Sequence, residues 1–147
     1  MERTTTRPID ALIATYSESH RNRTNEIIHF ICVPAIVFTV LGLFWAIHPM
    51  AAFGAVALSL WYYFTLSVPM AIGMAAMSAL MLYALSLLPQ QLVWQSSLAI
   101  FVLAWIGQFI GHKIEGKKPS FFDDLRFLLI GPLFVLSFLY RRLNVAY

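Results

Sequence analysis

The sequence predicts an all-α fold, a polytopic membrane helical bundle with about four transmembrane helices. Hydrophobic residues make up 60% of the 147-residue chain, and no Asp, Glu, Lys or Arg occurs between Ile27 and His112. Charged residues account for only 12% of the chain, against about a quarter in a typical soluble domain. A soluble fold could not cover its surface with such a long uncharged run. We therefore expect residues 1–147 to form a single integral-membrane domain.

An amphipathic helix is predicted from Pro8 to His20. Its apolar residues follow the i, i+3, i+4, i+7 spacing of one helical face: Ile9, Leu12, Ile13 and Tyr16. Pro8 suits the first helical turn. We expect this helix to lie along the membrane interface and to direct His20 toward the bundle. A polar turn over residues 21–24 should follow it.

Four apolar stretches come next, over residues 27–47, 51–68, 70–88 and 92–111. Each approaches or reaches the roughly 20 residues that a helix needs to cross a hydrocarbon core of about 30 Å. Pro34 is a candidate for a kink in the first of them. A fifth apolar stretch, residues 127–139, is too short to cross at about 1.5 Å per residue. Because Gly131-Pro132 interrupts it, we expect a C-terminal re-entrant or interfacial hairpin.

The basic residues define an orientation. Every Lys and Arg lies in residues 1–26, 113–126 or 141–142, and the turns at 48–50, 69 and 89–91 contain none. The positive-inside rule makes the basic side cytoplasmic, in a bacterial inner membrane or in the ER membrane of a eukaryote. No basic stripe alternates with aromatic residues, so nucleic acid is not an expected partner.

The predicted spans bring several polar side chains to that cytoplasmic surface: His20, His29, His112, Glu115, Asp123 and Asp124. Trp105, Gln108, His112 and Glu115 also share one helical face. Three histidines with nearby carboxylates suit a transition metal that keeps open coordination positions. Two simpler explanations of these polar residues need no metal. Each histidine could be satisfied by backbone or water, and the carboxylates could pair with neighbouring basic side chains.

Two longer motifs add to this reading. The first is His20, Asn25 and His29, separated by four and three residues and followed by Val33-Pro34. The second runs from Trp105 to His112 and continues with Glu115-Gly116-Lys117-Lys118-Pro119 and Asp124. Together they resemble the motifs of the 2-hydroxy fatty acid dioxygenase family. This family is known from the fungal ER enzyme that performs α-oxidation in phytosphingosine breakdown. The hydrophobic spans between the motifs also fit, so the resemblance covers nearly the whole chain.

The resemblance implies an Fe(II)-dependent dioxygenase of lipid metabolism. Its substrates would be a 2-hydroxy fatty acid and O₂, and its products a fatty acid one carbon shorter, CO₂ and water. This equation balances without an external reductant. The implied metal ligands are His20, His29 and His112. Glu115 or Asp124 would complete the coordination sphere or hold a ligand, and Glu115 is included among the catalytic residues.

The expected substrate-binding residues are Asn25, Gln108, Lys113 and Arg126, of which the basic pair would attract the acidic head group. These two cations could equally serve only to set the topology. Because His20 and His29 are nine residues apart, one straight helix would place them on opposite faces, so the polar turn at residues 21–24 is needed to bring them together. The acyl chain is expected between the spans, against Trp105 and Phe109.

The alternative is a non-enzymatic small membrane protein, either a transporter or an assembly factor. Its polar residues would serve as contacts between helices or as a proton path. Such a protein should carry polar groups throughout the bilayer depth, whereas the polar residues of this chain collect at one surface.

Overall fold

A computed structural model describes residues 7–147, and within them every regular element is a helix. The elements are α1 (Pro8–Ser17), α2 (Arg23–Ile47), α3 (Pro49–Leu66), α4 (Val68–Ser86), α5 (Gln90–Glu115), the 3₁₀ turn η1 (Ser120–Phe122) and α6 (Phe127–Arg142). Four of them, α2 to α5, are long and apolar enough to cross a membrane. The predicted all-α membrane bundle with four spans is confirmed.

Local sequence explains where the long helices begin and end. His48 ends α2 and caps α3, because its Nδ1 accepts a hydrogen bond of 3.1 Å from the backbone N–H of Met50. The Ser67 hydroxyl caps α4 in the same way by accepting from the Met70 N–H at 3.4 Å. Gly116 terminates α5 in the left-handed region, with φ of 74°, which glycine adopts at no steric cost.

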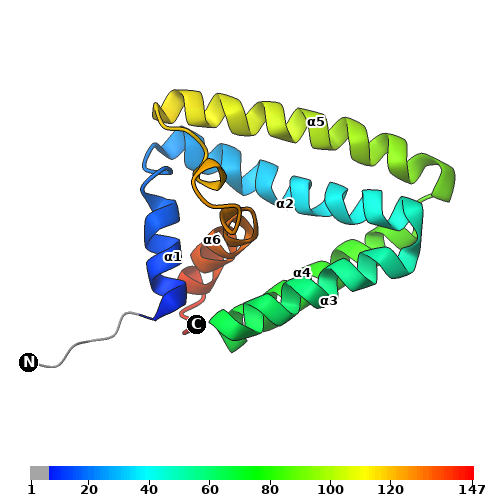
Figure 1. The fold of residues 1–147 in the computed structure, drawn as a ribbon, viewed down its shortest axis with the longest axis horizontal. Helices are drawn as coiled ribbons and strands as arrows, with labels where there is room; N and C mark the ends of the chain where they lie inside the picture. Colours follow the sequence, from blue (N-terminus) through cyan, green and yellow to red (C-terminus); the bar gives the residue numbers. More distant parts are fainter. Residues whose placement is uncertain (1–6) are drawn as a thin grey trace, which may run out of the picture.

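The helices form two pairs arranged as a wedge. In Figure 1, α2 runs beside α5 and α3 runs beside α4, and the pairs meet where α2 turns into α3 and α4 turns into α5. They diverge toward the other end, where α1 and α6 close the open side. Buried residues of α1, α3, α4 and α6 share one apolar cluster there, whereas a smaller cluster around Leu41 and Leu85 fills the narrow end.

Glycines allow α2 and α5 to approach closely. A Cβ on Gly107 of α5 would lie 2.7 Å from Cys32 Sγ of α2, and one on Gly111 would overlap Asn25 Oδ1. Gly107 and Gly111 form a small-xxx-small pattern, which typically marks close packing between membrane helices. The outer surface is apolar, as expected for lipid contact: Leu58 is 77% exposed and Leu80 71%.

Two details differ from the predictions. The C-terminal segment is not a hairpin, because α6 continues without a break through Gly131 and Pro132. An interior proline costs one hydrogen bond and roughly 3 kcal/mol, which packing offsets here: Ile130 and Leu133 on either side are fully buried. The first helix also ends at Ser17 rather than at His20, although its predicted face, including Ile9 and Ile13, is buried.

Candidate metal centre

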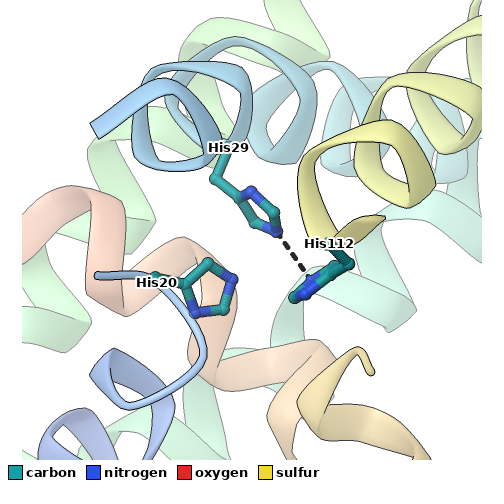
Figure 2. A group of neighbouring side chains, drawn as sticks. All are labelled: His20, His29 and His112. Carbon is teal, nitrogen blue, oxygen red and sulfur yellow. Dashed lines mark hydrogen bonds between the residues drawn. The ribbon is translucent and has the colours of Figure 1, made fainter. Parts of the chain in front are cut away.

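Three histidines from separate parts of the chain converge at the wide end of the wedge. His20 lies in the loop between α1 and α2, His29 on α2 and His112 near the end of α5 (Figure 2). One ring nitrogen from each lies within 4.8 Å of the others. All three side chains are buried, with 1% to 5% of their surface exposed. The structure therefore brings together the three residues expected to bind the metal.

The ring orientations suit metal binding. His20 Nδ1 donates a hydrogen bond to the Tyr16 carbonyl at 2.7 Å, and His29 Nδ1 donates to the Asn25 carbonyl at 2.9 Å. A carbonyl oxygen accepts only, so these Nδ1 atoms carry the ring protons, and in the neutral rings each Nε2 keeps a lone pair that can accept a hydrogen bond or bind a metal. His29 Nε2 accepts a hydrogen bond of 3.1 Å from His112 Nε2–H (Figure 2). Two nitrogen ligands of one metal ion can lie at a similar separation.

The loop between α1 and α2 delivers His20. Its ring stacks on Tyr16 with 4.2 Å between centroids, and its Nε2 has no hydrogen-bond partner among residues 7–147. Burial lowers the pKa of His20 to about 4, so the ring is neutral, as a ligand must be, at physiological pH. The predicted break between the helices is present, but it covers residues 18–22 instead of 21–24, because Asn22 caps α2 by accepting from the Thr24 N–H at 2.9 Å and the helix begins at Arg23.

Glu115 faces this loop. Its carboxylate accepts hydrogen bonds from the backbone N–H groups of Arg21 at 3.1 Å and Asn22 at 2.8 Å, and from Asn25 Nδ2 at 3.1 Å. The Lys117 ammonium adds a bond of 2.9 Å to the Glu18 carbonyl. The end of α5 and the residues just after it thus hold the segment that carries His20.

The remaining predicted residues lie in different surroundings. Asn25 is fully buried between Glu115 and the Ser19 carbonyl. Asp124 is at the surface, where hydrogen bonds from Arg126 lower the pKa of its carboxyl group and the two side chains form an ion pair of 2.6 Å. Lys113 is exposed. The structure does not bring Asp124, Lys113 or Arg126 to the three histidines.

A cavity of about 60 Å³ adjoins His29 and His112. Trp105 and Gln108 line it together with His112, so these three members of the predicted polar face of α5 do meet at one site. Ser120, from η1, also lines it. Among the described residues, the Trp105 Nε1–H and the Ser120 hydroxyl are buried without a hydrogen-bond partner. Buried donors are normally satisfied, so both groups are available to hydrogen-bond a molecule that enters the cavity.

Sequence reasoning missed Ser120. A single serine after Pro119 in a loop has no spacing signal, and only the packing of η1 against α6 makes it part of the cavity wall. The role of Gly107 and Gly111 in the close packing of α5 against α2 was also missed, although their small-xxx-small spacing is visible in the sequence.

Comparison with known proteins identifies the family of the chain. The chain matches the Mpo1-like family, described as 2-hydroxy-palmitic acid dioxygenase Mpo1-like, over residues 6–143. It belongs to that family. It is also 30% identical over 136 residues to the 2-hydroxy-palmitic acid dioxygenase MPO1 of Saccharomyces cerevisiae, covering 86% of this chain and 76% of the yeast protein. No solved structure matches the chain. The expected membership of the 2-hydroxy fatty acid dioxygenase family is confirmed, and the motifs that suggested it supply all three histidines.

Proposed function

We propose that this chain is an Fe(II)-dependent dioxygenase that shortens 2-hydroxy fatty acids by one carbon through α-oxidation. The observation that carries the proposal is the convergence of three buried imidazoles beside a small cavity, in a member of the Mpo1-like family. A 2-hydroxy fatty acid and O₂ become the shorter acid, CO₂ and water. The hydroxy acid provides all four electrons, so the reaction needs no nicotinamide or flavin.

The donor set fits ferrous iron. Imidazole nitrogen binds iron as well as zinc, copper and nickel, and a set of three leaves positions open for other ligands. His20, His29 and His112 would hold the ion, and the hydrogen bonds from two of their Nδ1 atoms to backbone carbonyls would fix the rings. When bound, Fe(II) would supply the redox chemistry with O₂ that the amino-acid side chains lack.

The chain's own residues would bind and orient the acid head of the substrate. Trp105 and Ser120 line the cavity, and the Trp105 Nε1–H and the Ser120 hydroxyl have no partners among residues 7–147. A carboxylate accepts such hydrogen bonds strongly. The Gln108 amide lies in the same wall and can donate to the carboxylate or accept from the 2-hydroxyl. Lys113 and Arg126, at the surface, would attract the anion before it enters.

The site would operate at the cytoplasmic face of a bacterial inner membrane, or of the ER membrane in a eukaryote. The positive-inside distribution of Lys and Arg supports this orientation. A fatty acid dissolved in the bilayer presents its head group at the same depth.

The test is anaerobic loading of the detergent-purified protein with Fe(II), followed by 2-hydroxypalmitate carrying a ¹³C label in its carboxyl group, and air. We expect a fifteen-carbon acid and labelled CO₂, detected by mass spectrometry. The His112→Ala variant should lose both bound metal and product, whereas His48→Ala, a helix cap far from the site, should retain them. Iron binding without product would overturn the reaction. Absence of both metal and product would favour the non-enzymatic alternative.

A further inference from the structure

A second, larger cavity lies between the two helix pairs. It has a volume of about 370 Å³, and all five helices from α2 to α6 line it. This volume is within the roughly 300–1,000 Å³ typical of small-molecule sites. By contrast, the cavity of about 60 Å³ beside the histidines has room only for the head of a substrate.

The two cavities adjoin each other. Five residues line both of them: Ile36, Val37, Trp105, Leu128 and Pro132. A molecule whose head occupies the histidine end would need to pass only these shared side chains, Trp105 among them, to extend into the larger cavity.

The larger cavity has an apolar lining. The Tyr63 hydroxyl donates to the Leu129 carbonyl at 3.0 Å, and the Ser59 hydroxyl donates to the Ala55 carbonyl of its own helix at 2.9 Å. These two hydroxyl groups therefore already donate hydrogen bonds within the protein. Ser78 adds one further hydroxyl, and nearly all the other lining side chains are apolar. A saturated hydrocarbon chain fits such a wall, because it would bury mainly apolar surface.

The dimensions fit an acyl chain. From His29 to Phe44, which lines the far part of the cavity, α2 rises about 22 Å at about 1.5 Å per residue. One leaflet of a bilayer is about 15 Å of hydrocarbon, half of the full core. The path from the histidines to Phe44 is therefore long enough for an ordinary lipid chain.

We infer that this cavity, which we call the acyl groove, binds the hydrocarbon chain of the substrate, and that its far end sets the longest chain accepted. The far end is formed by Phe44 of α2 with Ala55 and Val56 of α3, close to the narrow end of the wedge where α2 turns into α3 (Figure 1). The small Ala55 side chain leaves space that a larger residue would fill. This inference rests on the proposed function for the identity of the substrate.

The first test locates the chain without needing turnover. A 2-hydroxy fatty acid with a diazirine at the end of its chain is irradiated with the purified protein, and labelled residues are mapped by mass spectrometry. We expect label on Phe44, Ala55 or Val56, reduced by excess 2-hydroxypalmitate. Label confined to outward-facing residues such as Leu58, which is 77% exposed, would overturn the inference.

The second test measures chain-length preference. Ala55→Phe should lower the ratio of long-chain to short-chain turnover by roughly 10-fold or more, since a pocket discriminates about 10- to 200-fold per methylene. Leu58→Phe on the outer face of α3 is the matched control and should leave the ratio unchanged. Val56→Ala, which removes bulk and avoids overpacking, should shift the preference toward longer chains.

The outcomes separate this inference from the proposed function. Label at the far end without turnover of any 2-hydroxy acid would support the acyl groove and contradict the dioxygenase reaction. Turnover with unchanged chain-length preference in both Ala55→Phe and Val56→Ala would support the reaction and overturn the acyl groove.

Discussion

At the scale of single residues, surroundings decide what each polar side chain does. His29 lies within the first apolar stretch and His48 directly follows it. His48 caps a helix, whereas His29 belongs to the buried cluster with His20 and His112. Glu115 and Asp124 are both acidic candidates from the same motif, but Glu115 bonds to the loop that carries His20 and Asp124 pairs with Arg126 at the surface.

Replacing Glu115 tests whether it positions His20. Glu115→Gln removes the charge and turns an amide NH₂ toward N–H donors, so the loop should loosen. We expect metal affinity to fall by roughly 10- to 100-fold, as is typical when a group behind a metal ligand is changed. Fe(II) titration of the purified protein measures this. Asp123→Asn, at an exposed ion pair with Lys118, is the control, and equal affinity in Glu115→Gln and the native protein would contradict the role.

At the scale of elements, the pair formed by α2 and α5 sets the separation of His29 and His112. Three glycine contacts run along this pair, with Gly42 against Ser97, Gly107 against Cys32 and Gly111 against Asn25. Gly111 directly precedes His112, and Asn25 lies one helical turn before His29. The spacing of α2 and α5 and the separation of His29 and His112 are therefore linked at the same residues.

The Gly111→Ala substitution tests that link. Its Cβ would overlap Asn25 Oδ1, and such overpacking usually costs about 1–3 kcal/mol. We expect a lower free energy of unfolding in detergent together with weaker Fe(II) binding. Gly54→Ala is the matched control, since its Cβ would meet nothing within 4 Å, and its better helix propensity should leave stability unchanged or slightly raised. Equal stability of the two variants would argue against close packing here.

At the scale of the whole molecule, the histidine cluster and most of the charged residues lie at the same end. The wide end of the wedge carries the three histidines and the basic segments of the described residues, and the narrow end carries His48 and the uncharged turns at 48–50 and 89–91. The acyl groove runs from one toward the other. This arrangement would let a lipid keep its head at the membrane surface while its chain stays within the hydrocarbon.

Thiol labelling tests the orientation. In a Cys32→Ala background, Met50→Cys marks the turn at the narrow end and Lys118→Cys marks the basic side; both positions are exposed. In intact bacterial cells that express the protein, a membrane-impermeant thiol reagent should label the Met50→Cys variant directly. The Lys118→Cys variant should be labelled only after permeabilisation. The opposite pattern would invert the predicted topology.

The sequence by itself was enough to predict the all-α class, the four spans and which three histidines lie together. These follow from signals within one stretch of chain: uncharged runs of membrane length, clustered Lys and Arg, and two motifs with fixed spacing. Tertiary structure decided what depends on contacts between distant segments. Packing on both sides of Pro132 made α6 one helix, three N–H donors near His20 directed Glu115 to the loop, and folding buried Ser120. The acyl groove likewise exists only because the two helix pairs diverge, which no single stretch of sequence specifies.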